Sequence, residues 1–128
     1  MPTFETRWFK RYAKQERITD KSLRDAVDRA EKGLIDADLG GGLMKQRVAR
    51  PGEGKSGGYR VFIAYREQDR AVFLYGFPKN ERENIDPDEL KELRILGRGW
   101  LNASPEKIAE AIKDGGLTEI KSDNKKKA

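Results

Sequence analysis

Three neighbouring segments in the middle of the chain constrain the fold most strongly, because their residues are patterned as strands. They are LMKQRVA at 43–49, YRVFIAYRE at 59–67 and RAVFLYGFP at 70–78. In the first segment the side chains alternate, so that Met44 and Val48 face one side while Lys45 and Arg47 face the other. The other two segments are apolar on both faces, which is typical of the middle of a sheet. The pattern predicts a small antiparallel sheet whose first strand has a basic outer face.

Helical patterns precede this sheet. Aromatic and apolar residues at spacings of three and four predict a helix over residues 6–16, and the few residues before it could form a short edge strand. Thr19 is a favourable N-cap for a second helix, and Gly33 is a favourable stop. The residues expected on the buried side of that helix are Leu23, Ala26, Val27 and Ala30.

Two more helices are predicted after the sheet. Asp86 at the N-cap, Pro87 at the first helical position and Glu89 at the third form a strong start signal. The apolar stripe of this helix is expected to be Leu90, Leu93, Leu96 and Trp100. A shorter helix begins at Ser104, and the side chains expected inside it are Ile108, Ala109 and Ile112.

The order of these elements predicts an α+β fold. We expect a single domain over residues 1–120, in which helices pack on one face of a small antiparallel sheet. The other face, which carries Lys45 and Arg47, is expected to remain open. The tail KSDNKKKA has no apolar residues to bury, so residues 121–128 are expected to be mobile.

The composition excludes several kinds of chemistry. The chain has no Cys, which excludes disulfides and thiolates, and no His, the side chain most often used for acid–base work and metal binding. The acidic clusters near Asp36 and Asp86 have plainer roles in loops and helix caps, so no metal site is predicted. No apolar run reaches the roughly 20 residues that span a bilayer, and the polar N-terminus is unlike a signal peptide. We therefore expect a cytoplasmic protein without a membrane partner.

The positive charge is concentrated in the centre of the chain. Between residues 43 and 82, nine Lys and Arg face four Asp and Glu, whereas the rest of the chain holds 18 of each sign. The whole net charge of +5 therefore belongs to the strand region. A local excess of this kind indicates a polyanionic partner, although solvated surface charges give the same pattern.

The stretch ARPGEGKS at 49–56 is similar to a phosphate-binding P-loop. A P-loop, however, requires a helix that begins at its Ser, with the helix N-terminus facing the phosphates. Here Ser56 is followed by two glycines and a strand pattern, and Ala49 replaces the first glycine of the motif. We therefore expect a loop between two strands, and no bound nucleotide.

Several segments together resemble a known family. The basic strand of 43–49, the Gly58-Tyr59-Arg60 start of the next strand and the Lys79-Asn80-Glu81-Arg82 segment after the third are its most specific parts. With the two N-terminal helices and the Leu-rich helix, they resemble the RelE/ParE superfamily of bacterial toxins, in its HigB-like branch, over roughly residues 1–100.

The resemblance implies a RelE-like fold and a toxin of a type II toxin–antitoxin system. The implied activity is cleavage of mRNA on the ribosome, where the 2′-hydroxyl attacks the adjacent phosphate without a metal or other cofactor. The implied partners are a cognate antitoxin protein and ribosome-bound mRNA.

The resemblance also assigns residues. The positions that match the family's catalytic basic residues are Lys45, Arg47, Arg60 and Arg82. Fixed guanidinium groups suit this chemistry because they can donate two parallel hydrogen bonds to the oxygens of the transition state. A neutral Lys45 would also serve as the base that takes the 2′-hydroxyl proton. The residues expected to hold the RNA backbone are Arg50, Lys55 and Lys79.

Two departures from the family pattern leave alternatives open. Asn80 stands where some relatives have Arg, and Asp86 stands where many have a Tyr that assists proton transfer or stacks on a base. Tyr59 and Tyr65 are expected to lie in the core instead. Two alternative functions remain: a ParE-like inhibitor of DNA gyrase and a non-catalytic RNA-binding module. A further alternative is that these cations form a solvated strand face and have no functional role.

Overall fold

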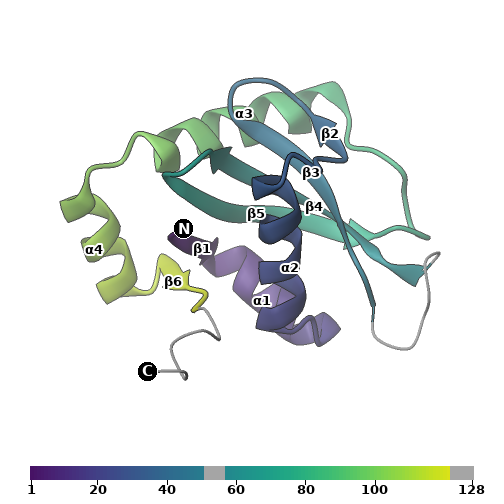
Figure 1. The fold of residues 1–128 in the computed structure, drawn as a ribbon, viewed down its shortest axis with the longest axis horizontal. Coiled ribbons are helices and arrows are strands. Elements are labelled where there is room, and N and C mark those ends of the chain that lie inside the picture. Colours follow the sequence, from purple (N-terminus) through teal and green to yellow (C-terminus); the bar gives the residue numbers. More distant parts are fainter. Residues whose placement is uncertain (51–56, 122–128) are drawn as a thin grey trace.

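The computed structural model describes residues 1–50 and 57–121, and it has the predicted α+β architecture. Six strands form one sheet, against which four helices pack (Figure 1). The expected loop around Lys55 and the expected mobile tail at 122–128 lie outside the described residues. The elements are β1 (Thr3–Thr6), α1 (Arg7–Glu16), α2 (Asp20–Glu31), β2 (Ala37–Asp38), β3 (Leu43–Val48), β4 (Tyr59–Arg66), β5 (Arg70–Pro78), α3 (Pro87–Leu101), α4 (Pro105–Asp114) and β6 (Leu117–Glu119).

The three predicted central strands are confirmed as the antiparallel run β3–β4–β5. The full order is β2-β3-β4-β5-β1-β6, so β1 is an internal strand and not the expected edge strand. It pairs in parallel with β5 and antiparallel with β6. The short edge strands β2 and β6 were not predicted, because two or three residues give too weak a local pattern. Apart from the β1–β5 pair, the sheet is antiparallel.

Each face of the sheet carries one pair of helices (Figure 1). The α1–α2 pair packs on the side of Val61 and Ile63, and the C-terminal helices pack on the side of Phe62 and Ala64. The expectation of one fully open face is therefore replaced by partial cover on both. The cause is the apolar content of both faces of β4 and β5, since each face must be buried against another layer.

Local start signals fix the helix ends as predicted. The Thr19 side chain accepts a hydrogen bond from the backbone N–H of Ser22 at 3.1 Å. Asp86 and Glu89 form a reciprocal capping box at the start of α3, with Pro87 at the first helical position. None of the helices in the described part of the chain is both long and apolar enough to cross a membrane.

Two predicted apolar stripes are wrong in detail. Leu96 is 44% exposed, and the neighbouring Gly97 is buried against the sheet instead. A Cβ at Gly97 would lie 3.1 Å from the Cβ of Ala64, so the missing side chain allows α3 to approach β4 closely. In α4, Ile112 is 41% exposed and Ala109 is also exposed, and Ala111 faces the core in their place.

Candidate nucleic-acid interface

Three predicted site residues meet on the side of the sheet that carries α3. Arg47 on β3 lies directly opposite Arg60 on β4, and Lys45 lies opposite Phe62. Opposed residues of an antiparallel pair have Cβ atoms about 4.5–5.5 Å apart, and alternate residues of one strand share a face about 6.6 Å apart. The register therefore brings Lys45, Arg47 and Arg60 close enough together to contact one phosphate group or two adjacent ones. We call these three residues the cationic triad.

Arg60 has an unusual environment within this triad. Its Nε is buried, yet it has no hydrogen-bond partner in the described part of the chain. A buried N–H without a partner costs about 1–3 kcal/mol, so such groups are uncommon unless a ligand satisfies them. The Nε of Arg24 has the same environment, so this feature does not by itself mark a site, and an Nε without accessible surface does not contact a ligand directly.

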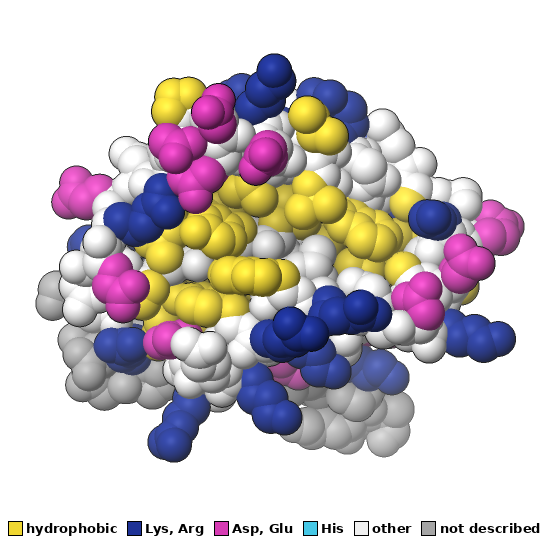
Figure 2. Space-filling view, turned by 180° about the vertical axis from the view of Figure 1, so that it is seen from behind, with side chains coloured by type: hydrophobic (Ala, Val, Ile, Leu, Met, Phe, Trp, Pro, Cys, Tyr) yellow, Lys and Arg dark blue, Asp and Glu magenta, His cyan; other side chains and the backbone are white. Residues whose placement is uncertain are grey.

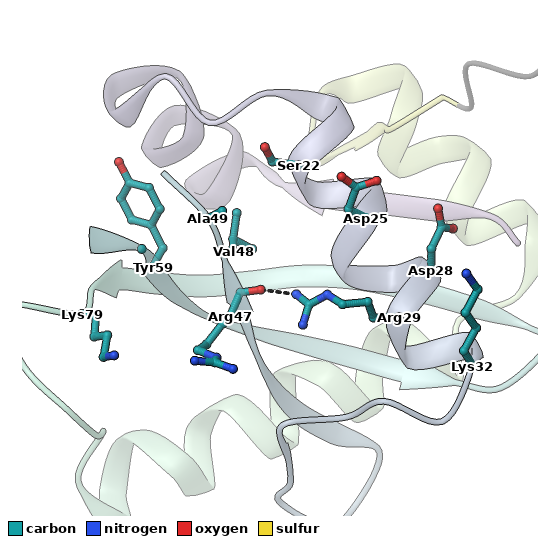
Figure 3. Close-up of a pocket in the computed structure, with 11 residues that line it drawn as sticks. Ser22, Asp25, Asp28, Arg29, Lys32, Arg47, Val48, Ala49, Tyr59 and Lys79 are labelled. Atoms are coloured by element: carbon teal, nitrogen blue, oxygen red, sulfur yellow. Dashed lines mark hydrogen bonds between the residues drawn. The ribbon is translucent and has the colours of Figure 1, made fainter. Parts of the chain in front are cut away.

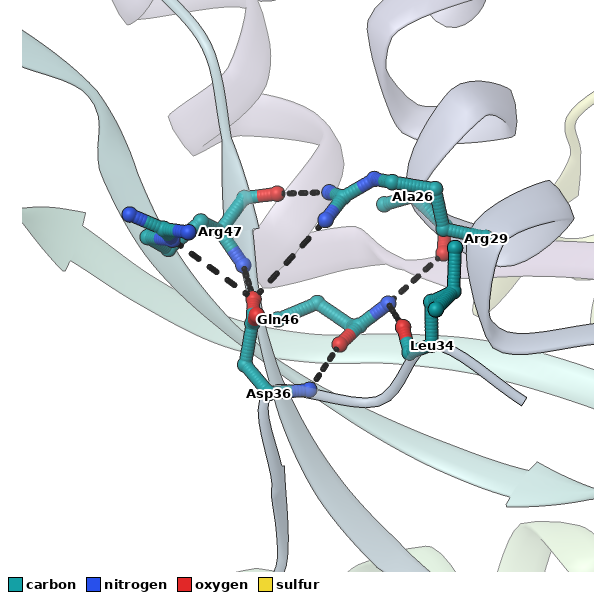
Figure 4. Close-up of polar contacts among 6 residues, drawn as sticks. All are labelled: Ala26, Arg29, Leu34, Asp36, Gln46 and Arg47. Carbon is teal, nitrogen blue, oxygen red and sulfur yellow. Dashed lines mark hydrogen bonds and ion pairs between the residues drawn. The ribbon is translucent and has the colours of Figure 1, made fainter. Parts of the chain in front are cut away.

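Arg47 is positioned through its backbone. Its N–H donates to the Asp36 carboxylate at 2.6 Å, and its carbonyl accepts from Arg29 (Figure 4). The Arg47 side chain is 56% exposed and stays within 3.9 Å of Asp36. Asp36 and Arg29 thus bind the backbone of β3 just beyond the point where its pairing with β2 ends.

A buried glutamine supports this arrangement. The Gln46 amide donates to the carbonyls of Ala26 at 2.9 Å and Leu34 at 3.2 Å, and its oxygen accepts from the Asp36 N–H at 2.7 Å (Figure 4). Gln46 is 0% exposed and points toward α2, opposite to its neighbours on β3. It ties β3 to α2 and to the segment that carries Asp36, and no sequence signal identified it.

Arg82 is paired with a carboxylate. Its guanidinium donates to both oxygens of Glu89, at 2.6 and 3.2 Å, and lies 5.0 Å from the centre of the Phe77 ring. These hydrogen bonds raise the pKa of Arg82 and lower the pKa of Glu89. Glu89 therefore has two roles at once: it caps α3 and it pairs with Arg82. The sequence indicated only the first role.

One lysine of the triad and one lysine beside it make contacts with neighbouring segments. Lys45 Nζ donates to the Asn84 side chain at 3.0 Å, which links β3 to the loop before α3. Lys79 follows β5, and its backbone N–H donates to the carbonyl of Gly58 at 2.9 Å. Lys79 therefore lies at the end of the β4–β5 hairpin, beside the start of the strand that carries Arg60.

Arg50 is not brought to the triad. Its guanidinium donates to Glu16 at 3.1 Å and to the Tyr59 hydroxyl at 2.9 Å, on the side of the sheet that carries α1. Lys55 lies outside the described residues. Tyr59 is 1% exposed and belongs to the core. Tyr65 is half-buried and packs against the same core cluster. The prediction that neither tyrosine joins the basic face is confirmed.

Other cations of the central segment have structural contacts. Arg66 donates to the carbonyl of Leu101 at 2.9 Å, and Arg70 donates to the carbonyls of Trp100 and Ala103 at 2.8 and 2.9 Å. They satisfy the carbonyls that α3 leaves free at its C-terminal end. Among the described cations of this segment, several therefore stabilise the fold, and the triad and Lys79 are the ones that lie on or beside the basic face.

A hollow of about 730 Å³ lies between α2 and the edge of β3 (Figure 3). Arg47 and Lys79 lie on its strand side, and Asp25 and Asp28 line it from α2. Arg29 and Lys32 also line it from α2, so four cations face two carboxylates and the lining has a net positive charge. Arg47 belongs both to this hollow and to the triad, so the two basic surfaces adjoin at β3.

The face that carries the triad is also rich in apolar side chains. Figure 2 shows hydrophobic side chains gathered across the middle of this face, with Lys, Arg and acidic side chains around them. On β5, Tyr75 is half-buried and Phe77 is buried, and they lie opposite Phe62 and Arg60 of β4 in the sheet register. Cations beside aromatic rings are a common arrangement for single-stranded nucleic acids. The sequence pattern identified the cations and missed the rings.

The geometry agrees with a match to a family of known proteins. The family model described as RelE toxin of RelE / RelB toxin-antitoxin system matches residues 1–120. The matched range includes every described strand and helix, together with the cationic triad.

Proposed function

The chain belongs to the RelE toxin family, and we propose that it is an endoribonuclease of the HigB-like branch that cleaves mRNA on the ribosome. Family membership implies a toxin of a toxin–antitoxin system, and the chemical activity is our inference. The observation that carries it is the strand register, which places Arg60 directly opposite Arg47 and on the same face as Lys45.

The proposed reaction is an in-line transfer at one phosphate. The 2′-oxygen of a nucleotide forms a bond to the adjacent phosphorus, and the bond from phosphorus to the 5′-oxygen of the next nucleotide breaks. The products are a 2′,3′-cyclic phosphate and a 5′-hydroxyl. Negative charge grows on the nonbridging oxygens, where the forks of Arg60 and Arg47 would donate hydrogen bonds.

Proton transfers complete the atom balance of this reaction. The proton of the 2′-hydroxyl must leave as the new bond forms, and the 5′-oxygen must gain one as it departs. We assign the first transfer to Lys45, and the second proton comes from water. Arg82 contributes only when its guanidinium exchanges Glu89 for a phosphate, because the carboxylate fills its fork in the free protein.

The implied partner is an antitoxin of the RelB type. We propose that it covers the triad with acidic segments or displaces α3, whose N-terminal turn holds Arg82 through Glu89. Co-purification from the native host tests this idea. A toxin that is recovered alone, from a gene with no small neighbour, would contradict it.

Induced expression separates the proposal from its main alternative. Mapping mRNA 5′ ends should reveal cuts in phase with codons, which Arg60→Ala abolishes. A ParE-like inhibitor would instead give trapped gyrase–DNA breaks and leave mRNA ends unchanged. Expression that arrests growth with DNA breaks and intact mRNA would overturn the nuclease proposal.

A further inference from the structure

A row of side chains crosses the sheet from a cation of the triad to aromatic rings. Lys45 on β3 lies opposite Phe62 on β4, which lies opposite Tyr75 on β5. The Tyr75 ring contacts the ring of Trp8, with centroids 4.9 Å apart. Trp8 belongs to the first turn of α1, which follows the end of β1. The row therefore connects the triad to these rings through the buried Phe62.

The rings at the far end of this row are accessible. Phe62 is 0% exposed, whereas Tyr75 is half-buried and Trp8 is 45% exposed. The indole is nonetheless held in place, because the Tyr12 ring stacks on it at 5.3 Å with an interplanar angle of 14°. A rigid aromatic surface that is open to solvent is a platform for stacking.

We propose that Trp8 and Tyr75 form a stacking site for a nucleobase of the bound RNA. The inference rests on the proposed function, since the cationic triad would hold the phosphate next to that base. Bases have apolar faces and a charged backbone beside them, which matches exposed rings that adjoin cations. The base must come from a single-stranded segment, because bases of a duplex are already stacked.

The arrangement favours this occupant over a purely apolar or a purely ionic partner. An apolar partner would gain nothing from desolvating Lys45 and Arg60 at the border of the rings. A purely ionic partner would leave nearly half of an indole exposed. A role in folding alone would bury Trp8, as it buries Phe9 one residue later, which is 0% exposed.

Binding to ribosomes programmed with a defined mRNA tests the proposal. The nucleotides in the A site carry 2′-O-methyl groups to block cleavage, and a second set of messages lacks one base at a time. Trp8→Leu is expected to weaken binding about five- to tenfold, and Trp8→Phe should restore most of it. One abasic position should weaken the unmodified protein similarly and leave Trp8→Leu unaffected. Ile95→Ala, at an exposed apolar residue of α3, is the matched control.

The outcomes separate this inference from the proposed function. Equal binding by Trp8→Leu and the unmodified protein overturns the stacking site, and so does undetectable binding of either to programmed ribosomes. A loss that is the same for every abasic message also overturns it. If base-dependent binding holds while unmethylated mRNA stays intact, the stacking site stands and the nuclease proposal fails.

Discussion

The hydrogen bonds of Gln46 lead to a prediction that links folding to the site. The substitution Gln46→Met keeps a side chain of similar volume but removes the bonds to Ala26, Leu34 and Asp36. Each net hydrogen bond contributes about 0.5–1.5 kcal/mol, and the polar groups left behind are shielded from water. We expect the free energy of unfolding to fall by about 3 kcal/mol. For a chain of this size, that lowers the Tm by roughly 10 °C.

Urea unfolding followed by circular dichroism measures this loss. The matched control is Gln15→Met, at an exposed position of α1 without a side-chain hydrogen bond, which should change stability by less than about 0.5 kcal/mol. Equal midpoints for the two variants would refute the reasoning. The position of Asp36 beside Arg47 would then need another cause.

Two further predictions concern carboxylates. Burial raises the pKa of Glu5 from 4.5 to about 7, so the protein should lose stability as the pH rises through that interval. Glu5→Gln should lack this decline in urea unfolding, and a flat profile for the unmodified protein would contradict the assignment. Hydrogen bonds from Arg82 lower the pKa of Glu89, so their stabilisation is present above pH 4.5 and lost as the pH falls through the lowered pKa. Stability curves of Glu89→Gln and the unmodified protein should therefore converge in acid, and parallel curves would show that the pair is not coupled to folding.

Elements with strong local signals were predictable from the sequence. The N-caps Thr19 and Asp86 and the three central strands lie where their patterns indicated. The place of β1 was not predictable, because its pairing with β5 joins segments that are far apart in the chain. The burial of Gly97 in place of Leu96 results from the close approach of Gly97 to Ala64. This is a tertiary contact, so the sequence pattern of α3 alone did not indicate it.

The candidate site, like the fold, was predictable only where the signal lies within one local segment of the sequence. Alternation along one strand correctly placed Lys45 and Arg47 on a shared face. The position of Arg60 opposite Arg47 depends on the register between strands, which the sequence leaves open. The pairing of Arg50 with Glu16 arises from long-range packing. No local pattern could separate such paired cations from free ones.

Single-turnover cleavage of ribosome-bound mRNA by variants of Arg60 tests the central claim most directly. Arg60→Ala should lower the rate about a hundredfold or more, with little change in ribosome binding. Arg60→Lys should restore only part of the rate, because it keeps the charge and loses the fork. Arg11→Ala, at an exposed arginine of α1, should cleave normally. If Arg60→Ala cleaves as fast as the unmodified protein, the proposed role of Arg60 in catalysis is wrong.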